Sequence, residues 1–205
     1  DKICLSMLPN LKVENISSVR SEKAIFENIN FEVLPGQNIE IIGSNGSGKT
    51  TLLRTILGLI KQESGEISWL DDNENYNPYR VFDCLYQGHQ LGVKNLLTVY
   101  ENLQLTKNAK GMTKKEIYNT LSRVGLSNIN CLASNLSVGQ RKRIAIARWL
   151  LREFKIYLID EPFSALDDEA TLLIENLIRE LNSKGCSFIV TGHRPSGIIA
   201  TRVQI

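Results

Sequence analysis

One short segment constrains this chain more than any other, the run Gly-Ser-Asn-Gly-Ser-Gly-Lys-Thr at residues 43–50. Its glycines allow positive φ angles and let backbone N–H groups approach an anion with no side chain in the way. Lys49 adds a cation on a long stem, and Thr50 adds a hydroxyl that can ligate a divalent metal. The run therefore predicts a loop that binds the phosphates of a nucleoside triphosphate together with Mg²⁺.

The residues on either side of this loop support the same interpretation. Residues 37–42 predict a strand that enters the loop, and Leu52, Leu53 and Ile56 recur at helical spacing after it. A helix N-terminus behind a glycine loop is an anion site, because its first N–H groups have no partner within the helix. The candidate nucleotide-binding residues here are Gly43, Ser44, Asn45, Gly46, Ser47, Gly48, Lys49, Thr50 and Thr51.

Composition and charge exclude several classes of function. At 205 residues, with 42% hydrophobic residues, the chain fits one globular domain with its own core. No apolar run approaches the ~18 residues of a membrane-spanning helix, and the N-terminus lacks the pattern of a secretory signal. We therefore expect no direct membrane insertion. A net charge of +2 is too balanced to indicate a nucleic-acid partner.

The order of predicted elements indicates an α/β fold in a single domain, residues 1–205. Strands are expected near residues 11–17, 25–33, 37–42, 66–70, 81–86, 156–160 and 187–191, and helices near 99–109, 113–124, 137–151 and 167–182. Residues 71–78 are polar and predict a loop. Because the central part is mostly helical, we expect a core of residues 1–88 and 154–205 and a helical subdomain of about 89–153.

A second motif is the run Ile-Tyr-Leu-Ile-Asp-Glu at residues 156–161. A strand this apolar is typical of a parallel sheet that is covered on both faces, and ligands bind at the carboxyl ends of such strands. We expect Asp160 to help hold Mg²⁺. Glu161 can then polarise a water molecule for attack on the terminal phosphate.

A third motif, Leu-Ser-Val-Gly-Gln at residues 136–140, begins a predicted helix. The hydroxyl of Ser137 and the first backbone amides form a second anion site. One compact subunit cannot readily bring both anion sites to the same phosphate. The economical solution is a second copy of the chain, whose nucleotide would contact Ser137, Gly139 and Gln140.

Together these motifs resemble the ATP-binding cassette (ABC) ATPases, whose pattern also includes a glutamine loop, a D-loop and a switch histidine. Residues 164–167 match the D-loop, and His193 matches the switch histidine. The resemblance covers nearly the whole chain and departs at Val138, where the family's signature has glycine. It implies a P-loop fold with a mostly parallel core sheet, an antiparallel β region and a helical insertion.

The family resemblance also implies roles for several residues. His193 would contact the γ-phosphate and hold Glu161 and the attacking water in place. Asp167 would lie at the seam of a homodimer that sandwiches two ATP molecules. The chain would then be an ATPase that uses ATP and Mg²⁺.

Two further positions depart from the general family pattern. Counting back from Leu97 by the family's usual interval leads to His89 instead of glutamine. Either His89 replaces the amide as a contact to Mg²⁺ or water, or the loop shifts so that Gln90 serves; we favour His89. Arg20 occupies the place of the adenine-stacking aromatic. A guanidinium can stack on a base, and a solvated Arg20 is the alternative.

Three runs, at residues 18–26, 88–94 and 136–151, resemble the ATP-binding subunits of the haem-export (Ccm) system of cytochrome c maturation, which have Gly-His-Gln at the glutamine position. This resemblance implies a peripheral ATPase on the cytoplasmic face of the inner membrane, partnered with the integral subunits B, C and D. The stretch 91–97 and the helix start after it are our candidate surface for the membrane partner. Core packing of that stretch is the alternative.

Three other functions are alternatives to haem export. The chain could serve another small-molecule exporter, act on DNA or ribosomes without transport, or regulate without turnover. About ninety residues separate the phosphate loop from the signature, and they show no sustained heptad repeat of the kind found in DNA-repair ATPases. Ribosome-acting members carry two cassettes, whereas this chain has one. Glu161 and His193 argue for turnover.

Overall fold

The computed structural model describes residues 10–20, 23–70, 76–77, 81 and 83–205. The chain divides into two units. The first comprises residues 1–88, 154–164 and 175–205, and the second comprises residues 89–153 and 165–174. Arg20 ends a described strand, but its side chain lies outside the described part, as does most of the predicted loop at 71–78.

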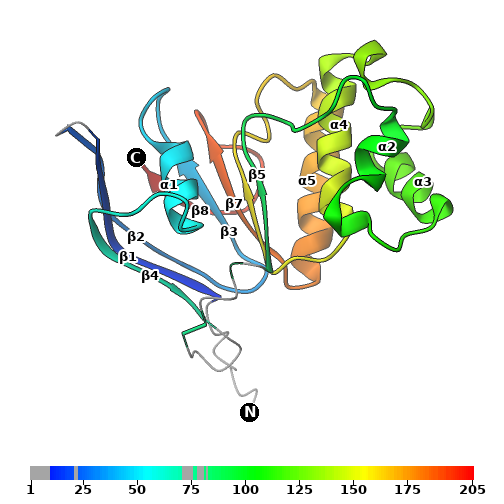
Figure 1. Ribbon diagram of the computed structural model, residues 1–205. Helices are drawn as coiled ribbons and strands as arrows, with labels where there is room; N and C mark the ends of the chain where they lie inside the picture. Colours follow the sequence, from blue (N-terminus) through cyan, green and yellow to red (C-terminus); the bar gives the residue numbers. More distant parts are fainter. Residues whose placement is uncertain (1–9, 21–22, 71–75, 78–80, 82) are drawn as a thin grey trace. The chain divides into compact units, whose positions relative to one another are not determined.

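An antiparallel sheet of three strands occupies one side of the first unit (Figure 1). Its strands are β1 (Leu11–Arg20), β2 (Lys23–Val33) and β4 (Ser64–Trp69), in the order β2-β1-β4. In the second half of β2 the buried and exposed residues alternate. This alternation is typical of a sheet with one face on the core and one in solvent.

A parallel sheet of five strands carries the functional edge of the first unit. Its strands are β3 (Asn38–Ile42), β5 (Cys84–Gln87), β6 (Ile156–Ile159), β7 (Ser187–Gly192) and β8 (Thr201–Gln204), in the order β5-β6-β7-β3-β8. Every residue of β3 and β6 is buried. Because the strands are parallel, the segments that follow β3, β6 and β7 all leave from the same edge.

Helix α1 (Lys49–Ile56) lies between the two sheets (Figure 1). Its Leu52, Leu53 and Ile56 are at most 1% exposed, and they share one hydrophobic core with residues of both sheets. The turn into the helix requires glycine at position 48, where φ is 103° and an added Cβ would collide with Ile25. The same contacts that bury α1 therefore fix its N-terminus at the end of β3.

The second unit is helical. Helices α2 (Val99–Gln104), α3 (Lys114–Arg123) and α4 (Val138–Ala147) contact one another. Each begins with a capping box, in which a Thr or Ser side chain and a Glu or Gln three residues later satisfy each other's backbone N–H groups. Helix α5 (Asp168–Ser183) begins in this unit, and its later residues belong to the first.

The predicted layout of a parallel sheet, an antiparallel region and a helical insertion is confirmed, and three details differ. The single helix expected at 99–109 is wrong, because α2 ends at Gln104 and only a short 3₁₀ turn follows at Lys107–Ala109. Between them, Thr106 is extended and its hydroxyl donates to the Leu103 carbonyl at 2.7 Å. The helix expected up to residue 151 changes to 3₁₀ after Ala147, and strand β8 was not predicted.

Candidate functional site

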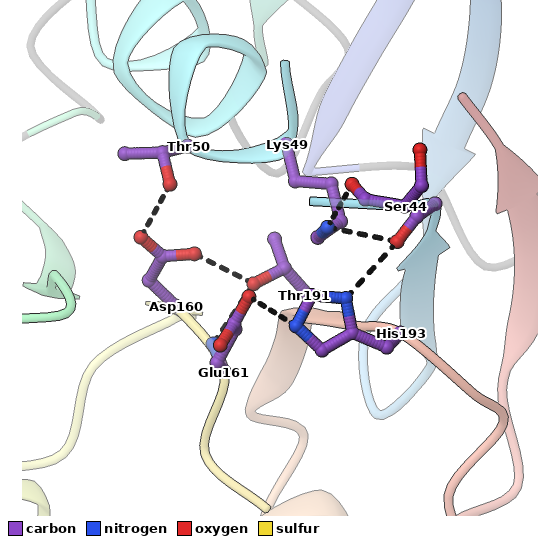
Figure 2. A network of polar contacts seen from close by, with 8 residues as sticks. Ser44, Lys49, Thr50, Asp160, Glu161, Thr191 and His193 are labelled. Carbon is purple, nitrogen blue, oxygen red and sulfur yellow. Dashed lines mark hydrogen bonds and ion pairs between the residues drawn. The ribbon is translucent and has the colours of Figure 1, made fainter. Parts of the chain in front are cut away.

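The phosphate loop is a preformed turn between β3 and α1. Gly46 and Gly48 have φ angles of 80° and 103°, which residues with a Cβ rarely adopt. Lys49 is 5% exposed, and its Nζ donates to the carbonyl oxygens of Gly43 and Ser44, each at 2.8 Å (Figure 2). The loop's own backbone thus holds this ammonium, and its positive charge lies within the turn predicted to bind phosphate.

A pocket of about 520 Å³ opens beside this loop. Its size is within the range of small-molecule sites. It is lined by Lys23, Ala24, Ile25, Asn45, Gly46, Gly48, Lys49, Thr50, Thr51 and Glu161. Six predicted nucleotide-binding residues of the loop and α1, together with the predicted catalytic acid, therefore share one cavity. Strand β2 supplies the wall that the sequence did not predict.

Asp160 connects the loop helix with the end of β6. It is 5% exposed, and its Oδ2 accepts a hydrogen bond from Thr50 Oγ1 at 2.7 Å (Figure 2). Its other oxygen, Oδ1, accepts from Thr191 Oγ1, also at 2.7 Å. The structure thus brings together two of the three residues predicted to hold a metal.

The chemistry of this pair fits Mg²⁺. The Thr50 hydroxyl and the Asp160 carboxylate are both oxygen donors, which this cation prefers. Mg²⁺ in nucleotide enzymes takes one or two protein oxygens and completes its shell with phosphates and water. No group of three or more His, Cys, Asp or Glu residues suited to a metal occurs in the described ranges.

Glu161 and His193 meet at the same edge. The His193 Nε2 lies 3.1 Å from Glu161 Oε1, and its Nδ1 lies 3.3 Å from the Gly43 carbonyl oxygen (Figure 2). Both partners are acceptors, so a neutral ring donates to one of them and a protonated ring to both. Glu161 has a φ of 52°, the left-handed region that is uncommon for residues with a Cβ. Such strain is often found at functional sites.

The second unit contains the remaining predicted contacts. Ser137 caps α4: its Oγ accepts from Gln140 N at 3.1 Å, and its own N–H donates to Gln140 Oε1 at 3.0 Å. Residues 137–140 are all exposed, and a Cβ added at Gly139 would meet nothing closer than Ser137 Oγ at 3.9 Å. This helix end is therefore open to a ligand. Val138 is 67% exposed, so the departure from the family's glycine causes no clash within the subunit.

Two other predicted residues also lie in this unit. Asp167 Oδ1 accepts from Ala170 N at 2.7 Å, so it caps the first turn of α5 while remaining exposed. His89 is the first residue of the unit, and its side chain is exposed. The role of His89 as a contact to the metal stays a prediction. The stacking of Arg20 on the adenine also stays a prediction.

The segment after His89 is fixed by a partly buried cation. Arg148, at the end of α4, donates from Nη1 to the Leu91 carbonyl at 2.7 Å and from Nη2 to the Gly92 carbonyl at 2.9 Å. Burial lowers the pKa of this guanidinium. Farther along, Leu96 is 88% exposed, and no residue of the stretch 91–97 is fully buried. This stretch lies on the surface of its unit.

Thr191 is the contact that the sequence did not reveal. It lies two residues before His193, and its hydroxyl touches both acids. Besides its bond to Asp160, Thr191 Oγ1 accepts from the backbone N–H of Glu161 at 2.8 Å. The signal was a hydroxyl residue on an apolar strand, and it becomes informative only once β7 is known to lie beside β6.

Comparison with known proteins agrees with this site. The chain matches the ABC transporter family over residues 26–164. It therefore belongs to the ABC transporter family. The prediction of an ABC-type ATP-binding subunit is confirmed.

Two curated relatives show a more specific similarity. Both are named cytochrome c biogenesis ATP-binding export protein CcmA. The protein from Vibrio parahaemolyticus is 38% identical over 189 residues, covering 90% of this chain and 92% of that protein. The protein from Nitrosococcus oceani is 39% identical over 198 residues, covering 95% of this chain and 90% of that protein.

Solved structures confirm the predicted fold. A putative ABC transporter ATP-binding protein from Pyrococcus furiosus superposes with a TM-score of 0.82 at 24% identity, covering 95% of this chain and 96% of that one. An ATP-binding cassette solved as a dimer in a post-hydrolysis state, with ADP and phosphate, gives a TM-score of 0.72 at 28% identity. That match covers 90% of this chain and 88% of the cassette.

Proposed function

We propose that this chain is the ATP-hydrolysing subunit of a membrane export complex for cytochrome c biogenesis, and that the complex exports or releases haem. One observation carries the catalytic part: His193 Nε2 lies 3.1 Å from Glu161 Oε1 at the edge of the phosphate-loop pocket. The cytochrome c part rests on the relatives named CcmA. Haem as cargo rests on the resemblance to the Ccm system.

The described side chains suit in-line attack of water on a terminal phosphate. Glu161 has a carboxylate in the pocket that can accept the proton of the attacking water. Lys49 and the loop amides stabilise the negative charge on the phosphates. His193 can donate a hydrogen bond to the terminal phosphate while its other nitrogen keeps contact with Glu161 or Gly43.

Thr50 and Asp160 are the residues that would hold Mg²⁺. When bound, this ion neutralises charge that develops on the phosphates. The side chains come to it from α1 and from the end of β6, two elements fixed by the same core. His89 is the third candidate contact.

We further propose that two copies of the chain sandwich two ATP molecules. The support is the exposed helix end at residues 137–140, whose Ser137 and Gly139 offer a second anion site. Asp167, exposed at the start of α5, would lie at the seam. A related cassette has been solved as a dimer.

The membrane attachment would come from partners. Among the described residues no helix combines the length and apolar character needed to cross a bilayer. We propose that the chain binds the integral Ccm subunits B, C and D at the cytoplasmic face of the inner membrane. Its surface for them would include the stretch 91–97, where Leu96 is 88% exposed.

An ATPase assay with a matched variant tests the catalytic assignment. Glu161→Gln keeps the size of the side chain and removes the base, so we expect kcat to fall about 10²-fold or more while nucleotide affinity stays within a few-fold. The wild-type chain, alone or with its membrane partners, should hydrolyse ATP only when Mg²⁺ is present. Equal turnover by the two proteins would contradict the role of Glu161.

Purification from native membranes tests the transport assignment. We expect the chain to co-purify with integral subunits of the cytochrome c maturation system, and loss of the chain to stop the assembly of c-type cytochromes. Recovery with the membrane subunit of a different exporter would support the alternative, another small-molecule transporter.

A further inference from the structure

Thr191 lies where the two catalytic strands end. It is the fifth residue of β7, two residues before His193, and it is 2% exposed. Strands β6 and β7 are parallel neighbours in which Ile159 is opposite Val190, so Asp160 and Thr191 come next in the same register. This register places the Thr191 hydroxyl against the segment Asp160–Glu161 (Figure 2).

The two hydrogen bonds of this hydroxyl are of opposite sense. An ionised carboxylate can only accept, so the single hydroxyl proton of Thr191 goes to Asp160 Oδ1, at 2.7 Å. A backbone N–H can only donate, so the Thr191 oxygen accepts from Glu161 N, at 2.8 Å. The orientation of the hydroxyl is therefore fixed by two bonds: its proton is donated to Asp160, and its oxygen accepts from the backbone of Glu161.

We propose that Thr191 is a positioning residue for both acids of the ATPase site. It fixes the carboxylate of Asp160 through Oδ1, which leaves Oδ2 turned toward Thr50. It also holds the backbone of Glu161 in the left-handed conformation from which its carboxylate reaches His193. The inference deepens the proposed function and rests on it.

No second side chain shown here duplicates these contacts. The only other side-chain bond to Asp160 comes from Thr50, within the described network, and Thr50 is itself a candidate metal ligand. Its hydroxyl therefore cannot be relied on to hold the carboxylate when the metal is bound. Glu161 adopts a φ of 52°, which is unfavourable for a residue with a Cβ, so its backbone needs an external partner.

The residue type suits the task. Threonine is β-branched, so its χ1 is restricted on a strand and its hydroxyl keeps one direction. Serine would keep the hydroxyl with more rotational freedom, and valine would keep the shape without the hydroxyl. Comparing the serine and valine substitutions therefore separates the effect of the hydrogen bonds from the effect of packing.

The test compares Thr191→Val with Thr191→Ser in the full chain, and uses Ser187→Ala as a matched control. Ser187 is buried at the other end of β7, where its hydroxyl donates to the Leu34 carbonyl at 2.7 Å. Two readouts need no turnover: amide hydrogen exchange at Glu161 in the ligand-free protein, and the Mg²⁺ concentration that half-saturates ATP binding. The third readout is the pair of kinetic constants kcat and KM, measured separately for each variant.

For Thr191→Val we expect the Glu161 amide to exchange about tenfold faster and the half-saturating Mg²⁺ to rise about tenfold. ATP affinity in EDTA should stay unchanged, and kcat should fall about 10–100-fold with little change in KM. Thr191→Ser should stay within about threefold of wild type in each measurement. Ser187→Ala should lower stability without changing the exchange of Glu161 or the Mg²⁺ dependence.

The proposal is overturned if Thr191→Val matches wild type in amide exchange and Mg²⁺ dependence, or if the Ser variant loses as much as the Val variant. Should Thr191→Val fail to fold, Thr191→Ala provides the hydroxyl-free comparison with the same criteria. A wild-type chain that does not hydrolyse ATP would contradict the proposed function, while the exchange measurement would still decide the role of Thr191.

Discussion

At the scale of single residues, the site depends on a few polar atoms held by backbone groups. Lys49 is the clearest case, since its ammonium is 5% exposed and has two carbonyl oxygens as partners. Its charge remains unmatched by any carboxylate within 4.0 Å among the residues the structure describes. A buried cation of this kind is favourable to an arriving polyphosphate.

Replacing Lys49 tests this view of the loop. Lys49→Ala removes a charge-assisted contact worth about 1.5–3 kcal/mol, so ATP affinity should fall about 10–100-fold. Titration with a fluorescent nucleotide measures the change, and Lys61→Ala, an exposed lysine beyond α1, provides the control with unchanged affinity. Equal affinity for Lys49→Ala and Lys61→Ala would show that the ammonium does not contact the phosphates.

The sequence predicted the residues whose chemistry is written in a local motif. Lys49, Thr50, Asp160 and Glu161 each belong to such a motif. The structure places Lys49, Thr50 and Glu161 around one pocket, and Thr50 donates a hydrogen bond to Asp160. Thr191 could not be found in this way. Its role depends on which strand lies beside β6, and strand order is set by long-range packing instead of by neighbouring residues.

At the scale of elements, helix starts are the best-predicted feature. The motif at residues 136–140 was expected to begin a helix, and the structure shows reciprocal capping bonds between Ser137 and Gln140. Thr113 caps α3 in the same way, with Glu116 as its partner. The capping boxes of α3 and α4, like that of α2, have the same chemistry and lie in one unit, and only that of α4 belongs to a predicted nucleotide site.

Alanine substitutions of these two N-cap residues separate an effect on stability from an effect on the association of two copies. Ser137→Ala and Thr113→Ala should each lower the free energy of unfolding by about 1 kcal/mol, because each removes an N-cap. Only Ser137→Ala should weaken the ATP-dependent association of two copies, by tenfold or more. Chemical denaturation and sedimentation velocity measure the two effects, and a Thr113→Ala protein equally impaired in association would contradict a direct contact by Ser137.

Elements that the sequence did not predict have weak local signals. Strand β8 is only four residues long, Thr-Arg-Val-Gln, and it forms because β3 offers it a free edge. The break after α2 depends on the extended Thr106 and its bond to Leu103, whereas the apolar spacing alone favours a longer helix. In both cases a neighbour or a single side-chain bond overrides the periodic pattern.

At the scale of the whole molecule, the chain has two predicted anion sites, one in each unit. The first unit has the phosphate loop with Asp160, Glu161 and His193, and the second has the exposed helix end at residues 137–140. The overall architecture was predictable because the order of motifs along the chain is characteristic of the ABC family. The run at residues 136–140 also predicts a second copy of the chain, and this homodimer stays a prediction.

The most direct test of paired sites is the mass of the Glu161→Gln protein in solution, measured by sedimentation with and without Mg-ATP. This variant should bind ATP without consuming it, so we predict a monomer without nucleotide and a dimer with it. Adding Ser137→Ala to the same protein should return it toward the monomer. A Glu161→Gln protein that stays monomeric while saturated with Mg-ATP would contradict the account.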